Sequence, residues 1–94
     1  MSEEQQSTPS VYDHLTHVME LMAQVSWAKL GLQPDIITGK IETNLPEAKV
    51  AIDVMAYLAT QVEGQLDDGD RRQLHGMIRD LRVNYVQKTS EVGS

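Results

Sequence analysis

Two sets of side chains in this 94-residue chain have residue types and spacings that could bind a metal ion or a phosphate group. The first is His14, His17 and Glu20, which follow one another at three-residue steps. On a helix this spacing lines up imidazole and carboxylate groups that can bind a divalent metal. A complete site also needs a fourth ligand and supporting hydrogen bonds, and this edge of the helix is polar and normally solvated. We therefore predict no metal site and no cofactor.

The second set is basic and lies on one side of a predicted helix near the C-terminus. We call it the arginine strip, and it comprises Arg71, Arg72, Arg79 and Arg82, with His75 among them. Guanidinium groups bind phosphates through two parallel hydrogen bonds, so the strip could contact nucleic acid. No aromatic residue interleaves with the arginines to stack on bases. Pairing with acidic residues of a neighbouring helix or subunit, or simple solvation, is the more economical interpretation.

The charge distribution also argues against general nucleic-acid binding. The chain carries a net charge of −6, and up to Gln65 it has nine acidic residues against three lysines. From Leu66 onward five acidic residues balance five basic ones. An acidic chain repels phosphate backbones and anionic lipids, so we expect neither a nucleic acid nor a membrane as partner.

Length and composition predict one small domain that needs extra stabilisation. Domains of this size gain little from a single core, and they often rely on disulfides, metals or oligomerisation. The chain has no cysteine, which leaves oligomerisation as the common remaining device. Residues 1–9 are polar, without a basic or apolar run, so we interpret them as a disordered tail rather than a targeting signal. No segment approaches the roughly 20 apolar residues of a membrane span, which makes the cytoplasm the expected location.

The elements that carry these residues are predicted to be three helices in a single domain spanning residues 10–88. The first helix covers about 10–30, with Ser10 as its N-cap and Gly31 as a left-handed residue after its end. Its predicted apolar stripe is Val11, Leu15, Val18, Met22 and Val25.

A loop rich in isoleucine separates the first two helices. Because Ile36, Ile37 and Ile41 are apolar, we expect the loop to fold back on a helix, with a strand-like piece around Gly39. The second helix covers about 45–63, and we expect Asn44 and Glu47 to form a capping box at its start.

The third helix covers about 68–87 and shows one narrow apolar stripe. We expect the second helix to stop at Gly64 through a left-handed conformation, and acidic residues around Asp68 to begin the third. Gly76 lies off the stripe. Either it allows close packing against a second chain, or the helix tolerates the loss of stability that a glycine in its interior causes. Residues 89–94 are interpreted as a frayed tail.

The second helix is apolar over more than half of its circumference. One stripe consists of Ala48, Ala51, Ile52, Met55, Leu58, Ala59 and Val62, and a second stripe beside it consists of Val50, Val54 and Tyr57. A helix of this kind must be covered on two sides, either within its own domain or at a subunit interface.

Trp27 and the methionines offer two further candidates for recognition. Trp27 projects from the polar side of the first helix, so it is either an interface anchor or a residue covered by the isoleucine loop, and we favour the loop. Met19, Met22, Met55 and Met77 are adaptable side chains that suit a groove for a partner helix, although core positions are their commoner use.

The order of several short motifs resembles a family of short bacterial proteins known as the domain of unknown function 1844 family. The motifs are Trp27-Ala28-Lys29-Leu30-Gly31-Leu32, Pro34, Gly39, Asn44-Leu45, Ala48-Lys49, Ile52-Asp53, Leu58, Gly64, Leu66, Leu81-Arg82 and Tyr85. The resemblance covers roughly residues 11–87 and implies a helical fold and a bacterial cytosolic setting. It implies no activity, cofactor or catalytic residue.

Together these features predict an all-α, three-helix protein in which a helical hairpin supports a third helix. We expect a non-enzymatic interaction or scaffold protein that forms a homodimer or higher oligomer, with Trp27, Val50, Val54 and Tyr57 as candidate interface residues. The alternative is a binding module of a larger, ribonucleoprotein-like assembly that uses Arg71, Arg72, Arg79 and Arg82. Another protein is a further possible partner.

Overall fold

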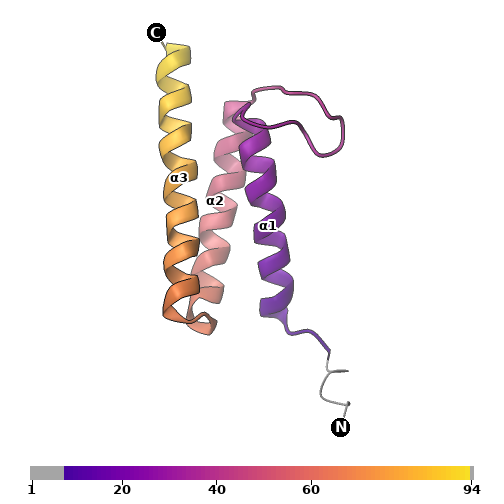
Figure 1. Ribbon diagram of the computed structural model, residues 1–94, viewed down its shortest axis with the longest axis vertical. Helices are drawn as coiled ribbons and strands as arrows, with labels where there is room; N and C mark the ends of the chain where they lie inside the picture. The colour runs from indigo at the N-terminus through magenta and orange to yellow at the C-terminus, as the bar shows by residue number, and fades with distance from the viewer. Residues whose placement is uncertain (1–7, 94) are drawn as a thin grey trace.

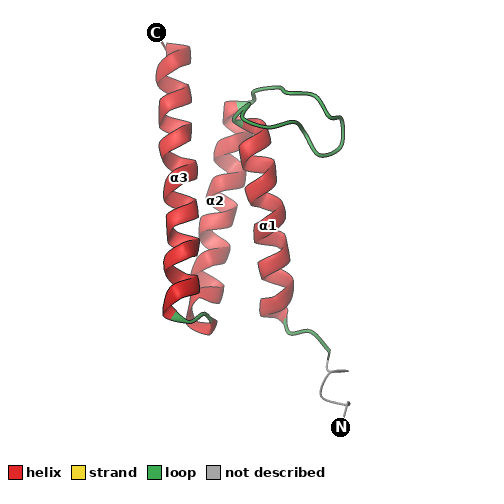
Figure 2. Ribbon diagram, in the orientation of Figure 1, coloured by secondary structure: helices red, strands yellow, loops and turns green. Residues whose placement is uncertain are grey.

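The computed structural model describes residues 8–93 and consists of three α-helices and one short 3-10 turn (Figure 1). In chain order these are α1 (Val11–Lys29), α2 (Leu45–Val62), η2 (Glu63–Gln65) and α3 (Asp68–Gly93). The other described segments are loops (Figure 2). The predicted all-α, three-helix fold is therefore confirmed. Most of the predicted tail, residues 1–7, and Ser94 at the other end lie outside the described residues.

The start of α1 is fixed by a complete capping box. The Ser10 side chain accepts a hydrogen bond from the Asp13 backbone, and the Asp13 carboxylate accepts one from the Ser10 backbone. The box satisfies free amides of the first turn and places a negative charge at the positive end of the helix dipole. Ser10 is thus the N-cap, as predicted.

The end of α1 depends on Gly31, which adopts the left-handed conformation with φ of 80°. The Leu32 amide donates to the Trp27 carbonyl and the Gly31 amide donates to the Ala28 carbonyl, the two bonds of a Schellman motif. Directly after it, an isolated antiparallel bridge joins Leu30 to Thr43. The two ends of the connecting loop are therefore pinned side by side.

The loop between α1 and α2 does not fold back on a helix, and that expectation was wrong. Ile36, Ile37 and Ile41 are all exposed, with Ile37 at 89%, and Figure 1 shows the loop projecting beside the end of the hairpin. Its tip is shaped by Asp35, whose carboxylate accepts hydrogen bonds from the Ile37 and Thr38 amides. These bonds, that of Thr38 first, hold the pKa of Asp35 below its usual value. The strand-like piece predicted around Gly39 is replaced by the bridge at Leu30 and Thr43.

The start of α2 combines a side-chain cap with a link to α1. Asn44 accepts a hydrogen bond from the Glu47 amide, and Pro46 occupies the first turn. The Glu47 carboxylate lies 2.8 Å from Lys29 Nζ on α1, in place of the predicted contact with the N-cap backbone. The hydrogen bond and charge of Glu47 raise the pKa of Lys29. Glu47 therefore links the two helices at the loop end of the hairpin.

The other end of α2 tightens into η2 and does not use a left-handed glycine. Gly64 lies inside η2 and has no positive φ, which corrects the predicted stop. Asp67 then caps α3, since its carboxylate accepts a hydrogen bond from the Asp70 amide. The chain reverses within a few residues, so α2 and α3 are antiparallel neighbours.

Helix α3 is longer than predicted. The sequence prediction ended it near residue 87 and assigned 89–94 to a frayed tail, whereas the helix continues through Gly93. The residues after Gln87 are polar apart from Val92 and include no proline, so no residue type there interrupts the helical hydrogen bonds before Gly93. Lys88 and Glu91 lie one turn apart, and Lys88 Nζ is 3.7 Å from Glu91 Oε1. This ion pair stabilises the last turns of the helix modestly.

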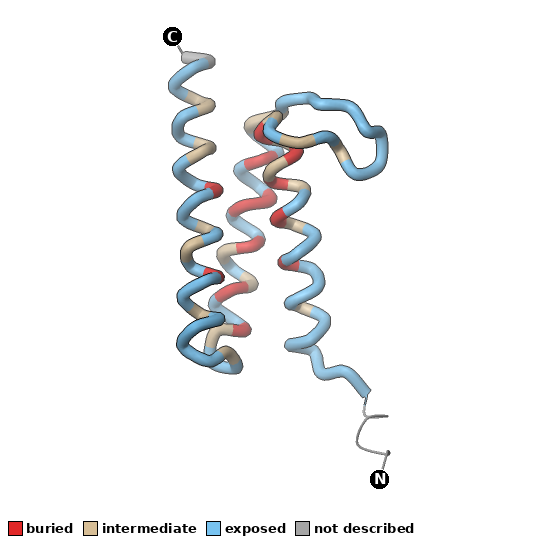
Figure 3. Tube along the Cα trace, in the orientation of Figure 1, coloured by how far each residue is buried: buried red, intermediate tan, exposed pale blue. Residues whose placement is uncertain are grey.

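The core is centred on α2, as Figure 3 shows by the buried positions on α2 and on the parts of α1 and α3 beside it. The buried stripe of α2 consists of Ala48, Ala51, Ile52, Met55, Ala59 and Val62. Small residues Ala23 and Ser26 are buried on α1, and the Ser26 hydroxyl donates to the Met22 carbonyl. Small side chains at this seam allow α1 and α2 to pack closely.

The buried side of α1 differs from the predicted stripe. Met19, Ala23 and Ser26 face α2, whereas Val11 and Val18 are exposed. The steps from Met19 to Ala23 to Ser26 to Leu30 are four, three and four residues, the spacing of a helix face. Counting only large apolar residues hid this face because two of its members are small.

Helices α1 and α3 both pack on α2 but hardly on each other. Figure 1 shows α2 between them. The third helix therefore packs on one member of the hairpin and leaves an open angle between α1 and α3.

Two glycines provide a paired test of this backbone. Gly31→Ala should destabilise the fold by about 1–2 kcal/mol, because alanine disfavours positive φ and the added Cβ would collide with Thr43 Oγ1. Gly76→Ala should stabilise it by about 0.5–1 kcal/mol, because this helical position offers ordinary contact 3.7 Å from Arg79 Nη2. Urea unfolding of both variants measures the change in the free energy of unfolding. Changes of the same sign in both would contradict the left-handed conformation of Gly31 or the helical one of Gly76.

Candidate functional site

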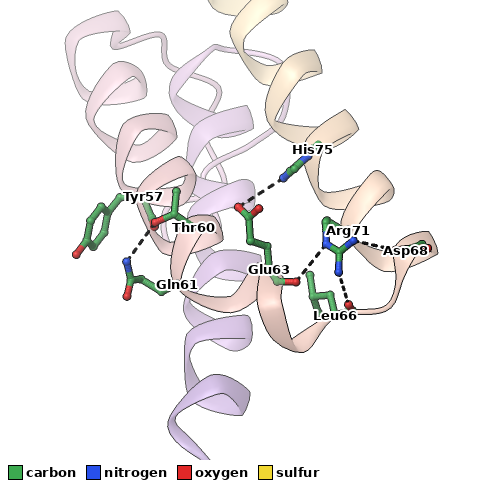
Figure 4. Close-up of polar contacts among 8 residues, drawn as sticks. All are labelled: Tyr57, Thr60, Gln61, Glu63, Leu66, Asp68, Arg71 and His75. Carbon is green, nitrogen blue, oxygen red and sulfur yellow. Dashed lines mark hydrogen bonds and ion pairs between the residues drawn. The ribbon is translucent and has the colours of Figure 1, made fainter.

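The arginine strip divides into residues with different roles. Arg71 forms a clamp on the connection between α2 and α3 (Figure 4). Its Nε donates to the Glu63 carbonyl at 3.2 Å, its Nη2 donates to the Leu66 carbonyl at 2.9 Å, and its Nη1 contacts Asp68 at 2.8 Å. Glu63 begins η2 and its carbonyl also accepts a hydrogen bond from the Leu66 amide, whereas Leu66 follows η2, where helical hydrogen bonding ends. Arg71 thus has a structural role that its sequence position did not reveal.

Two further members of the strip, Arg82 and His75, face acidic residues of α2 and η2. Arg82 Nη2 lies 3.6 Å from Asp53 Oδ1, and the other oxygen of Asp53 accepts a 2.7 Å hydrogen bond from Lys49. This hydrogen bond and the negative charge of Asp53 raise the pKa of Lys49. His75 Nε2 lies 3.8 Å from Glu63.

The remaining arginines, Arg72 and Arg79, are exposed on the outer side of α3, and Arg79 lies 3.9 Å from Asp80. Arg82 pairs with an acidic residue of a neighbouring helix, as in the more economical interpretation, whereas the partners of Arg71 are backbone carbonyls and Asp68 of its own helix. They leave the strip without a continuous row of available guanidinium groups.

Arg71 and Arg72 make a matched pair for testing the clamp. Arg71→Ala should lower the free energy of unfolding by about 1–3 kcal/mol, since two partly buried backbone carbonyls lose a charged donor. Arg71→Lys should recover only part of this loss, because one ammonium group cannot reproduce the fork. Arg72→Ala should change stability by less than about 0.5 kcal/mol. Chemical denaturation checks all three, and equal losses at both positions would contradict the clamp.

The predicted interface residues of α2 lie uncovered. Val50, Val54 and Tyr57 are 62%, 40% and 64% exposed, although the neighbouring stripe of the same helix is buried. They project from the side of α2 opposite α3, and Leu58 lies half-buried between them and α1. The helix is therefore packed on one broad side and apolar on the other.

Apolar residues of α1 extend this uncovered surface. Val11, Val18 and Leu21 are exposed, and the helical positions of Val11 and Val18 place them on the flank of α1 that turns away from α3, with Leu21 beyond Val18 at the outer edge of this surface. We define the hairpin outer face as these exposed residues of both helices: Val11, Val18, Leu21, Val50, Val54 and Tyr57. The sequence pattern assigned Val11 and Val18 to the core, so their place on this face is a structural finding.

Trp27 lies on the opposite flank of α1 from the hairpin outer face. It is partly buried and packs against the core, while the isoleucines expected to cover it are exposed. Its helical position matches that of Thr16 and Glu20, which line a groove shared with α3. Trp27 therefore does not belong with Val50, Val54 and Tyr57 on one surface.

The groove between α1 and α3 has a volume of about 330 Å³. One methionine from each helix lines it, namely Met19, Met55 and Met77. Val62, Leu66 and Leu74 complete the apolar part, and Thr16, Glu20, Asp70 and Gln73 supply the polar part. We call this the methionine groove.

The histidine and carboxylate set is not assembled into a metal site. His14, His17 and Glu20 lie on α1, and among the described residues no three acidic or histidine side chains are grouped closely enough to hold a metal ion. Glu20 contributes to the methionine groove, whereas His17 lies beside Asp13 and Thr16 in a separate surface hollow.

Within the described part of the chain, no helix has the length and apolar character needed to traverse a bilayer.

Comparison with known proteins gives a family but no characterised relative. Residues 11–87 match the family model described as "Domain of unknown function (DUF1844)", and the chain belongs to that family. No curated protein and no solved structure matches the chain. The match covers the three helices up to Gln87, including both the hairpin outer face and the methionine groove.

Proposed function

We propose that this member of the domain of unknown function family is a non-enzymatic interaction or scaffold module that forms a homodimer through the hairpin outer face. The observation that carries the proposal is the exposure of Val50, Val54 and Tyr57 on a helix whose other apolar stripe is buried except for the half-buried Leu58. Exposed apolar residues grouped on one face are typical of interaction sites, whereas scattered ones need no explanation.

The charge pattern favours a second copy as the occupant of this face. With a net charge of −6, two copies repel each other over most approaches. The six residues of the hairpin outer face are uncharged. At the end of the face, the charge of Glu47 is matched by that of Lys29, 2.8 Å away. Two such faces can therefore meet without opposing like charges.

Dimerisation would also supply stability that a small chain lacks. The core is that of a single small domain, its α1–α2 seam uses alanine and serine, and no disulfide is possible without cysteine. A two-fold arrangement would pair each hairpin face with its own copy and close the assembly at two chains. The face would then resemble the centre of a four-helix bundle made from two hairpins.

A charge placed in the centre of the face should separate the subunits. Val54→Glu should raise the dimer dissociation constant at least about tenfold, because a buried carboxylate would have no partner in the interface. Sedimentation equilibrium over a range of concentrations measures the constant. Circular dichroism checks that the helices persist, which we expect because Val54 is already partly exposed.

Val83→Glu is the matched control. Val83 is 48% exposed on α3, outside the hairpin outer face, and the same substitution adds the same charge. Its dissociation constant should equal that of the wild-type chain. A loss of association in both variants would assign the effect to net charge, and retention in both would contradict the proposed interface.

A further inference from the structure

The methionine groove has the construction of a helix-binding site on the opposite side of the hairpin from the proposed dimer interface. Its floor is apolar and comes from all three helices. Met77 is 37% exposed at the groove, while Met19 and Met55 are buried deeper. Methionine side chains are flexible and polarizable, so such a surface can adapt to the side chains of an incoming helix.

The arrangement of the helices gives the groove two walls and a base. Because α1 and α3 both pack on α2 and hardly on each other, they form two walls with α2 at the base. A helix lying in this angle would contact all three and complete a four-helix arrangement. The groove of about 330 Å³ marks where the side chains of that helix would enter.

The charges at the groove specify the chemistry of its occupant. Glu20 on α1 and Asp70 on α3 place one exposed carboxylate on each wall. Among the described residues that line the groove, none is basic. An approaching helix therefore meets an apolar floor between two negative charges, and basic flanking residues would be attracted and oriented.

We propose that the methionine groove binds an amphipathic helix of another protein, in which basic residues flank an apolar stripe. Residues 1–10 of this chain are a poor occupant, since they carry Glu3 and Glu4 and no basic residue. A second copy would have to offer Arg72 and Arg79, since Arg71 and Arg82 on α3 already face groups of their own chain, and the dimer measurement below distinguishes that occupant. The proposal is independent of the dimer, which uses the other side of the hairpin.

A pair of designed peptides tests the stated chemistry. Each has 18 residues, the length of α2, with leucine at three- and four-residue steps and lysine, or glutamate in its counterpart, on the flanks. Fluorescence anisotropy of the labelled peptide, titrated with the full chain, measures binding. The lysine peptide should bind, and the glutamate peptide should bind at least about tenfold more weakly.

Two variants with matched controls locate the binding. Met77→Gln should weaken binding of the lysine peptide about tenfold by adding a polar group to the groove, whereas Val83→Gln on the same helix should not. Glu20→Gln with Asp70→Asn should weaken it about fivefold. The control pair Glu42→Gln with Asp80→Asn removes the same total charge outside the groove and should have little effect.

Several results would overturn the proposal. Equal weakening by both charge-removal pairs would show that the peptide responds to net charge and not to the groove. Binding that is insensitive to Met77→Gln, or equal binding of the two peptides, would also contradict it. A dimer that dissociates on Met77→Gln but persists in Val54→Glu would assign the groove to a second copy. Because the dimer test uses Val54 and this test uses Met77, each proposal can fail alone.

Discussion

The whole structure depends on the packing of α1 and α3 onto one side of α2. Small side chains such as Ala48, Ala51 and Ala59 allow the neighbours to approach closely, and Met55 and Val62 fill the space between them. Since α1 and α3 hardly touch, no other contact could replace this one. This packing also leaves two apolar regions without a covering element. They are the hairpin outer face and, on the opposite side of the hairpin, the methionine groove.

Several helix ends could be predicted from the sequence, because capping depends on residues only a few positions apart. Ser10 caps α1 and Gly31 ends it in the left-handed conformation, as their residue types indicated. Longer-range outcomes were not readable. Glu47 reaches Lys29 across the hairpin, and Arg71 reaches two carbonyls of the preceding turn. Both contacts depend on how the elements are placed relative to one another, which a local sequence pattern does not predict.

The candidate surfaces were predictable in part for the same reason. The second stripe of α2, Val50, Val54 and Tyr57, follows from helical periodicity, and its exposure follows only from where α3 packs. Trp27 was assigned to the polar side of α1 because nothing in the sequence shows that this flank turns toward the core. The isoleucines of the loop show the opposite error, since apolar type alone does not ensure burial.

A scaffold role requires that the chain satisfy its own exposed apolar surface, and the mass in solution measures this most directly. The chain has a mass of 10.5 kDa. Light scattering on the wild-type chain over a wide concentration range should give about 21 kDa, twice that mass, with dissociation only on dilution. A mass of 10.5 kDa that persists at the highest concentrations would contradict the account.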